Sequence, residues 1–184
     1  MMPRLLVLTD RTQLPEGRDL IESIATCVDA GLTHVVLREL DLPTPVRADL
    51  AEGFIDAGAI VIAAHDPIPG CAGVHLPCSG TAVAGLWGRS CHSAEDVGRA
   101  EEEGASWVTL SPFAASASKP GHRATLPASA FAGHRVPLYA LAGIDLGNAA
   151  AALAAGAYGI AVMGAVMRAD DPARVVSGLL GEVA

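Results

Sequence analysis

Ionisable and hydroxyl side chains follow several of the short apolar runs of this chain. Arg38 comes directly after one run, His65 and Asp66 come after the next, and Ser90 and His92 lie near another. Further residues of these types lie near the ends of other runs: Thr9, Asp10, Arg11, Glu39, Asp41, His75, Cys91, Ser93, Ser111, Ser116, Ser118, Lys119 and His122. Such groups bind anions, hold metal ions or transfer protons. If the runs are parallel strands of one barrel, these side chains meet at its C-terminal face and predict an active site there.

Two apolar runs late in the sequence each lead through a glycine into a helical pattern. The runs span residues 136–144 and 158–165, and Gly143 and Gly164 stand near their ends. A glycine lets the backbone approach a ligand closely, and free backbone N–H groups at the start of a helix bind an anion. A (β/α)₈ barrel uses the loops after its strands 7 and 8 in this way. The pattern therefore predicts a barrel that binds a phosphorylated small molecule.

Short apolar runs alternate with helical patterns along almost the whole chain. The spacing predicts strands at residues 4–8, 34–37, 60–63, 73–76, 84–88, 107–110, 137–140 and 159–163. It predicts helices at residues 19–30, 45–57, 94–103, 126–132, 148–155 and 172–182. Strict alternation indicates parallel pairing, so we expect one α/β domain spanning residues 1–184. Its expected fold is a compact (β/α)₈ TIM barrel with shortened helices after strands 3 and 4, and an open doubly wound sheet is the alternative.

The composition excludes several classes of function. The net charge is −8 and no run of Lys or Arg occurs, so we expect neither nucleic acid nor a membrane surface as a partner. Hydrophobic residues make up 51% of the chain and charged residues 17%, which favours a buried parallel sheet. No apolar stretch is long enough to span a membrane, and the first apolar run is too short for a signal peptide. We therefore expect a cytoplasmic protein, and its acidic, Ala- and Gly-rich surface is compatible with a homodimer.

A series of short motifs occurs in the order and at the spacing of one enzyme superfamily. They are Thr9-Asp10-Arg11, Leu37-Arg38-Glu39, Gly73-Val74-His75-Leu76, Gly88-Arg89-Ser90-Cys91-His92-Ser93, Ser118-Lys119-Pro120-Gly121 and Ala142-Gly143-Ile144. With these motifs the chain resembles the superfamily of thiamine phosphate synthase and of TenI, a thiazole tautomerase. The resemblance covers nearly the whole chain, and it implies a TIM barrel that acts on small phosphorylated substrates in thiamine biosynthesis.

The synthase joins a pyrimidine diphosphate to a thiazole phosphate and releases pyrophosphate. For this chain the resemblance implies that Arg38, Ser90 and Lys119 contact the diphosphate and that Asp66 holds Mg²⁺. A leaving diphosphate needs cationic donors and a metal to accept developing charge. Mg²⁺ takes carboxylate ligands together with phosphate oxygens, so these residue types fit the reaction.

The resemblance also implies a set of residues that bind the phosphate groups of the substrates. Gly143 and the backbone at Met163 and Gly164 would hold the thiazole phosphate. The family's Thr-x-Thr-Lys motif reads Ser116-Ala117-Ser118-Lys119 here, so we expect Ser116 and Ser118 to bind substrate phosphate groups.

Some positions differ from the family pattern. Leu40 stands where the synthase has a lysine, and Gly80 stands where it has its second Mg²⁺ aspartate. The synthase's Asn-Asp pair reads His65-Asp66, and Pro112 replaces the catalytic histidine of the tautomerase. The chain thus has one cation and one metal carboxylate fewer than the synthase pattern.

Three functions stay open at this point. The first is the coupling reaction of a transferase. The second is isomerisation of a thiazole carboxylate phosphate, with His65, His92 or His122 as the proton carrier. The third is a non-catalytic protein that binds thiazole phosphate or thiamine phosphate. Dependence on Mg²⁺ marks the first, and exchange of solvent deuterium into the thiazole marks the second. Phosphate-ligand binding without either activity marks the third.

Overall fold

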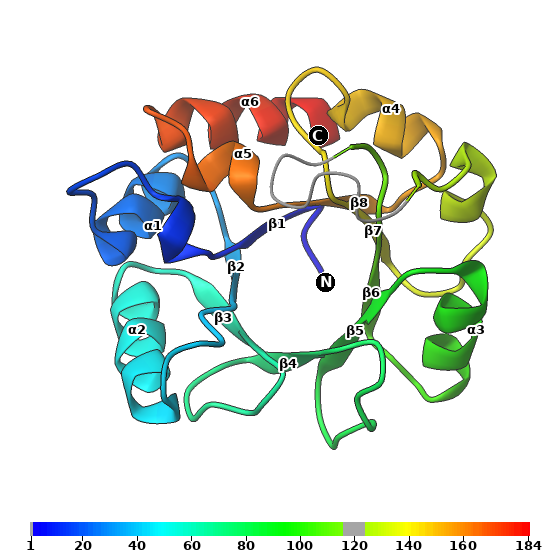
Figure 1. Ribbon diagram of the computed structural model, residues 1–184, viewed down its shortest axis with the longest axis horizontal. Coiled ribbons are helices and arrows are strands. Elements are labelled where there is room, and N and C mark those ends of the chain that lie inside the picture. Colours follow the sequence, from blue (N-terminus) through cyan, green and yellow to red (C-terminus); the bar gives the residue numbers. More distant parts are fainter. Residues whose placement is uncertain (1, 116–123) are drawn as a thin grey trace.

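Eight parallel strands close into a barrel in the computed structural model, which describes residues 2–115 and 124–184 (Figure 1). The strands are Leu5–Leu8 (β1), His34–Leu37 (β2), Ile60–Ala64 (β3), Gly73–Leu76 (β4), Trp87–Cys91 (β5), Trp107–Leu110 (β6), Leu138–Leu141 (β7) and Gly159–Val162 (β8). Each strand pairs in parallel with the next, and β8 returns to β1, where Val162 lies opposite Val7. The predicted (β/α)₈ barrel is therefore confirmed, and the open sheet is not what the chain forms.

Helices cover much of the outside of this ring (Figure 1). They are Leu20–Asp29 (α1), Thr44–Asp56 (α2), Ala94–Glu102 (α3), Ala149–Ala154 (α4), Gly164–Met167 (α5) and Pro172–Val183 (α6), with 3₁₀ turns at Arg11–Gln13 (η1) and Ala128–Phe131 (η2). Asp19, Ser93 and Asp171 cap the starts of α1, α3 and α6, because each side chain accepts a hydrogen bond from a backbone N–H of the first turn. Glycines in the left-handed conformation follow four helices: Gly31 (φ 103°), Gly58 (φ 96°), Gly104 (φ 86°) and Gly156 (φ 104°).

The wall around β4 carries no helix. Residues 65–72 and 77–86, all of them described, connect β3 to β4 and β4 to β5 as loops (Figure 1). The helices that we expected to be shortened after strands 3 and 4 are thus reduced to loops. Omitting these two helices lets a chain of 184 residues close a barrel that typically takes about 250.

The strand predicted at residues 84–88 lies three residues further along the chain, at Trp87–Cys91. The charged Arg89 concealed this strand from the hydropathy pattern. Its side chain is 1% exposed, and Nη2 lies 2.6 Å from both Glu103 Oε2 and the carbonyl oxygen of Gly80. Ser90 consequently lies within β5 and not after it. The helix predicted at residues 126–132 is only the short turn η2.

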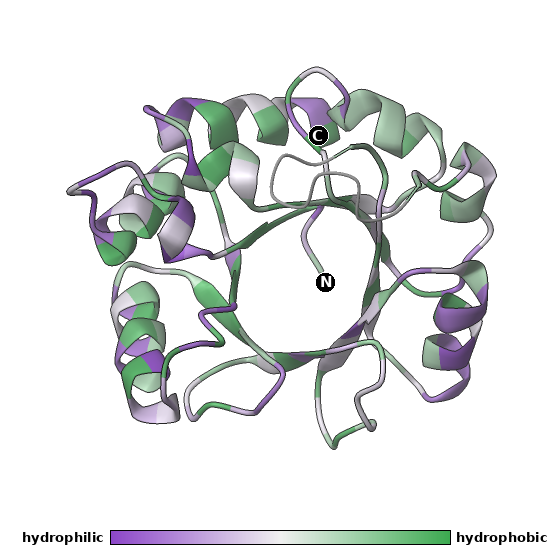
Figure 2. Cartoon of the chain, viewed as in Figure 1, coloured by the Kyte–Doolittle hydropathy of each residue, from purple (hydrophilic) through white to green (hydrophobic). Residues whose placement is uncertain are grey.

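Hydrophobic side chains pack in two layers, one inside the ring of strands and one between the ring and the helices. Figure 2 shows hydrophobic residues along most of the strands. Successive residues of a strand point to opposite layers, so β1 places Leu6 inside and Val7 outside. Trp107 fills much of the interior, and Gly88 on the neighbouring strand leaves room for it. A Cβ added at Gly88 would lie 2.1 Å from the indole ring, so this pair fixes the packing of β5 against β6.

The first residues of the chain close the N-terminal end of the barrel. The hydroxyl group of Tyr139 donates to the carbonyl of Pro3, and that of Tyr158 donates to the carbonyl of Met2. The two rings pack edge to face with centroids 5.7 Å apart. These contacts leave the C-terminal end as the open end of the barrel. In the described ranges, no helix has both the length and the apolar character needed to cross a membrane.

Candidate active site

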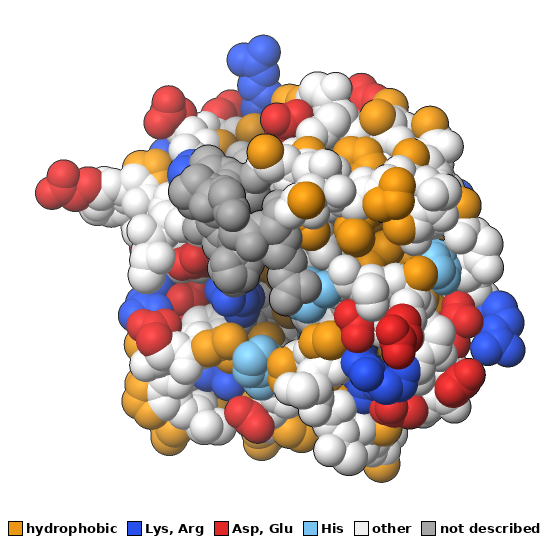
Figure 3. Space-filling model, turned by 45° about the vertical axis from the view of Figure 1, so that its right-hand side comes forward, with side chains coloured by type: hydrophobic (Ala, Val, Ile, Leu, Met, Phe, Trp, Pro, Cys, Tyr) orange, Lys and Arg blue, Asp and Glu red, His pale blue; other side chains and the backbone are white. Residues whose placement is uncertain are grey.

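A pocket of about 700 Å³ lies at the C-terminal end of the barrel, a size typical of small-molecule sites. Residues at the ends of all eight strands line it, from Leu8 at the end of β1 to Gly164 after β8. On the face shown in Figure 3, basic and histidine side chains lie among acidic and hydrophobic ones near the centre. The pocket brings together these residues predicted from the sequence: Arg38, His65, Ser90, His92, Gly143, Met163 and Gly164.

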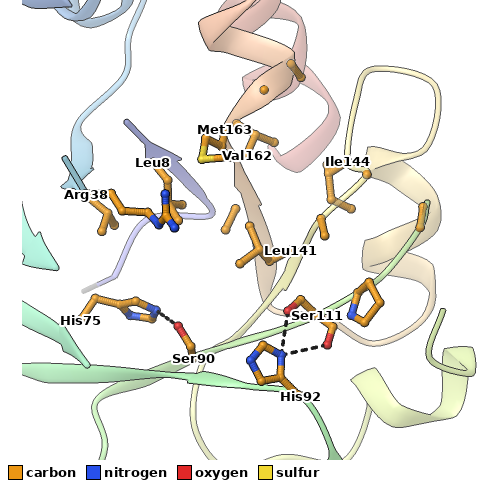
Figure 4. A pocket seen from close by; sticks show the side chains of 18 of the residues that line it. Leu8, Arg38, His75, Ser90, His92, Ser111, Leu141, Ile144, Val162 and Met163 are labelled. Atoms are coloured by element: carbon orange, nitrogen blue, oxygen red, sulfur yellow. Dashed lines mark hydrogen bonds between the residues drawn. The ribbon is translucent and has the colours of Figure 1, made fainter. Parts of the chain in front are cut away.

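Arg38 projects from the end of β2 into this pocket (Figure 4). Its backbone N–H donates to the hydroxyl group of the buried Thr9 at 3.0 Å, which anchors the residue. The neighbouring carboxylate of Glu39 pairs with Arg11 instead. It accepts hydrogen bonds from the backbone N–H and from Nη1 of Arg11, at 3.0 and 2.9 Å. Within the described residues Arg38 therefore has no ion-pair partner, and its charge faces the pocket.

A buried histidine orients the hydroxyl group of Ser90. His75 is 4% exposed, and its Nδ1 accepts a hydrogen bond from the indole N–H of Trp107 at 3.1 Å. An indole N–H only donates, so the proton of the neutral imidazole must lie on Nε2. That atom is 3.1 Å from Ser90 Oγ (Figure 4) and 3.2 Å from Thr109 Oγ1. Because Ser90 can accept from His75, its own O–H can donate to a ligand in the pocket.

This histidine also sets a pH dependence of folding. Burial, with a smaller contribution from the charge of His65, lowers the pKa of His75 from 6.5 to about 4. Between these values the unfolded chain binds a proton that the folded chain does not. The free energy of unfolding should therefore fall by about 3 kcal/mol as pH drops through this window.

We expect urea unfolding at pH 7.5 and pH 4.5 to show this slope in the wild type and a shallower slope in His75→Gln. His34 and His65, whose pKa values burial also lowers, remain in both proteins and cancel in the comparison. Equal slopes in the two proteins would contradict the assignment of a neutral, buried His75.

Four backbone N–H groups at the ends of β7 and β8 have no acceptor. They belong to Gly143, Ile144, Gly164 and Ala165, and none of them makes a hydrogen bond to any residue of the chain in the structure as described. The side chain of Asn148 fixes the conformation of the loop after β7. Its Nδ2 donates to Gly143 O at 2.7 Å, and its Oδ1 accepts from the backbone N–H of Asp145 at 3.0 Å. Unpaired N–H groups in one pocket wall are suited to binding an anion.

Gly143 allows this loop because of its backbone conformation and its close contacts. Its φ is 68°, and a Cβ there would lie 2.5 Å from Ala115 O and 2.7 Å from Ala114 O. The preceding Ala142 also has a positive φ, of 72°, which costs an L residue about 1–2 kcal/mol. Backbone strain of this kind concentrates at functional sites.

His92 forms a hydrogen-bonded pair with Ser111 on another wall of the pocket (Figure 4). His92 Nδ1 lies 3.1 Å from Ser111 Oγ and 3.4 Å from Ser111 O. A carbonyl only accepts, which favours a proton on Nδ1 and leaves Nε2 able to accept one. The backbone N–H of His92 donates to Asp96 Oδ2 at 2.9 Å, and Ser93 caps α3 as expected from the sequence.

The carboxylates near the pocket are few. Asp66 is exposed just after β3 and is not part of the pocket lining, although its neighbour His65 is. Asp145 lines the pocket, and its Oδ1 accepts from the backbone of Gly147 at 2.8 Å. The searched residues contain no group of three or more His, Cys, Asp or Glu side chains that could hold a metal ion. Gly80 has no side chain that could bind a metal, and its carbonyl accepts a hydrogen bond from Arg89.

Comparison with known proteins identifies the family. A sequence model for the family described as thiamine monophosphate synthase matches residues 71–166. A thiamine-phosphate synthase of Albidiferax ferrireducens is 33% identical over 193 residues, which cover 92% of this chain and 86% of that protein. The chain belongs to the thiamine monophosphate synthase family. A further member, the thiamine-phosphate synthase of Thermus thermophilus, is 40% identical over 100 residues, which cover 52% of this chain and 48% of that protein.

The barrel also matches solved structures. The thiamine phosphate pyrophosphorylase from Pyrococcus furiosus superimposes with a TM-score of 0.83 and 24% identity, covering 98% of this chain and 95% of that one. This match agrees with the closed barrel.

Four residues that the sequence predicts for the site lie outside the described residues: Ser116, Ser118, Lys119 and His122. The pocket also contains residues that sequence reasoning missed. Pro77 and Cys78 line it after β4, Asp145 lines it after β7, and Arg168 lines it after α5. A signal for Arg168 was present, because it follows Gly164 by four residues, which is one helical turn.

Proposed function

We propose that the protein is a transferase that couples a pyrimidine diphosphate to a thiazole phosphate and releases pyrophosphate. The observation that supports this proposal is that one pocket contains two separate sets of groups able to bind an anion. One is the guanidinium of Arg38, which has no ion-pair partner among the described residues, with the hydroxyl group of Ser90. The other is the set of N–H groups at Gly143 and Gly164, which have no acceptor in the same part of the chain. A reaction between two phosphorylated substrates requires both.

The charge distribution suits the chemistry of this coupling. A bond between carbon and a diphosphate oxygen breaks, its electrons leave with pyrophosphate, and the thiazole nitrogen bonds to the carbon. Negative charge therefore grows on the diphosphate in the transition state. Arg38 and the hydroxyl group of Ser90 would accept that charge, and Lys119, outside the described residues, would add a second cation.

Mg²⁺ would be bound largely by the diphosphate and water. Near the pocket, the described carboxylate that accepts no hydrogen bond from a neighbouring residue is that of Asp66. One carboxylate together with phosphate oxygens can coordinate Mg²⁺. The ion would supply positive charge to the leaving group. Asp66→Asn should raise the Mg²⁺ concentration needed for pyrophosphate binding by roughly tenfold. Calorimetric titrations measure this, with Asp49→Asn on the exposed side of α2 as the matched control. An unchanged requirement would contradict a role for Asp66.

Simultaneous binding of the two anions tests the proposal. Isothermal titration of thiazole phosphate into protein saturated with Mg²⁺ and pyrophosphate should give nearly the affinity measured without pyrophosphate. Mutually exclusive binding would mean that the pocket holds one anion and would contradict a coupling reaction.

A second candidate is isomerisation of a thiazole carboxylate phosphate by proton transfer, which the His92–Ser111 pair favours. Ser111 fixes the imidazole, and Nε2 is left to exchange a proton with a ligand. Nuclear magnetic resonance in D₂O checks this candidate. Incorporation of deuterium into the thiazole that His92→Asn abolishes would support isomerisation, and no incorporation would exclude it.

A further inference from the structure

Arg168 lies directly over the glycine at the start of α5. It follows the last residue of that helix and stands one turn after Gly164. Helical side chains lean toward the N-terminus of their helix, so a residue at this spacing reaches back over Gly164. A Cβ added at Gly164 would lie 2.4 Å from both Nη1 and Nη2 of Arg168 and 2.5 Å from Cζ. The guanidinium therefore occupies the place that a side chain at position 164 would take.

This guanidinium and the free N–H groups belong to the same wall of the pocket. Arg168, Gly164 and Ala165 all line the pocket, and Gly143 and Ile144 line it from the neighbouring strand end. Arg168 Nη1 donates to the side chain of Gln13, which reaches across from η1 and holds the guanidinium beside the end of β1. A positive charge thus lines the same pocket as four N–H donors that lack an acceptor among the described residues.

We propose that Arg168 binds the phosphate group of the thiazole substrate together with these N–H groups. The inference rests on the proposed function, and it adds a residue that determines specificity. Neutral N–H donors accommodate many acceptors, whereas a guanidinium favours the dianion of a phosphate monoester through charge-assisted hydrogen bonds. The pocket would thereby select the phosphorylated thiazole over the corresponding alcohol.

The contact with Gly164 supplies an independent way to test Arg168. The atoms that a Cβ at Gly164 would meet are the far end of a flexible side chain and not backbone. Gly164→Ala should therefore fold and should displace the guanidinium while leaving the arginine in the sequence. Its effect on phosphate binding should then depend on whether Arg168 is present.

The experiment is calorimetric binding of thiazole phosphate and of its unphosphorylated alcohol. Arg168→Met should weaken binding of the phosphate about 10- to 100-fold and binding of the alcohol less than about twofold. Arg168→Lys should give an intermediate loss, and Gly164→Ala should resemble Arg168→Met. The double variant should be no weaker than the weaker single variant. Arg174→Met, which removes an exposed arginine of α6 outside the pocket lining, is the matched control.

The outcomes separate this inference from the function on which it rests. If the wild type prefers the phosphate and Arg168→Met keeps that preference, the role of Arg168 is wrong and the phosphate site stands. Additive losses for Gly164→Ala and Arg168→Met would also overturn the inference, because they would show that the two residues act separately. If the wild type binds phosphate and alcohol equally, the proposed phosphate site itself fails.

Discussion

Replacing Arg38 by methionine should lower kcat for pyrophosphate release about 10²- to 10³-fold. The guanidinium lies in the pocket without a carboxylate partner among the described residues, so its charge is available to the leaving diphosphate. The stability of the fold should change little, because the anchoring bond to Thr9 comes from the backbone of Arg38. Steady-state kinetics and thermal unfolding of the same preparation measure both effects.

Arg38→Lys and Arg135→Met are the informative comparisons for this substitution. The lysine keeps the charge but cannot bind two oxygens with one planar group, so we expect an intermediate kcat. Arg135 is 77% exposed and pairs with Glu101 on the outside of the barrel, and its loss should leave kcat unchanged. A kcat for Arg38→Met within about twofold of the wild type would show that Arg38 does not stabilise the leaving group.

Substituting Gly143 with alanine should abolish thiazole phosphate binding, a loss of more than about 100-fold, and destabilise the fold. The added Cβ meets the backbone of Ala114 and Ala115 at 2.5–2.7 Å, and backbone atoms cannot move aside cheaply. The left-handed conformation adds about 1–2 kcal/mol of strain. The loop that presents the free N–H groups must therefore shift. Urea unfolding and calorimetric titration with thiazole phosphate provide the measurement.

Comparison with Gly133→Ala isolates the part of this effect that comes from contacts. Gly133 has a φ of 81°, but a Cβ there meets nothing within 4 Å. Gly133→Ala should be destabilised only by the strain of the left-handed conformation, and it should bind thiazole phosphate as the wild type does. If the two alanine variants matched in stability and affinity, the close approach at Gly143 would have no role in the site.

The barrel could be predicted from the sequence because each element carries a local signal. Apolar runs such as 34–37 and 107–110 and the glycines that end helices recur along the chain, and parallel strands in strict alternation with helices have few ways to pack. β5 was displaced in the prediction because Arg89 interrupts its apolar pattern. Only tertiary structure reveals that Glu103 neutralises that buried charge and that the Gly80 carbonyl accepts a hydrogen bond from it.

The pocket could be predicted only in part. Residues that follow strands, such as Arg38, could be assigned from position, because every strand of the barrel ends at one face. The role of His75 could not, since its protonation depends on Trp107, a residue 32 positions away in the sequence. The position of Arg168 depends equally on a tertiary contact, because Gln13 reaches it from the other end of the chain.

Chromatographic measurement of the product tests the coupling reaction most directly. Purified protein is incubated with the pyrimidine diphosphate, thiazole phosphate and Mg²⁺, and thiamine phosphate and pyrophosphate are quantified. We expect equal amounts of both products, formed only when both substrates are present. Absence of thiamine phosphate above the rate without protein, while calorimetry shows that both substrates bind, would contradict the coupling reaction.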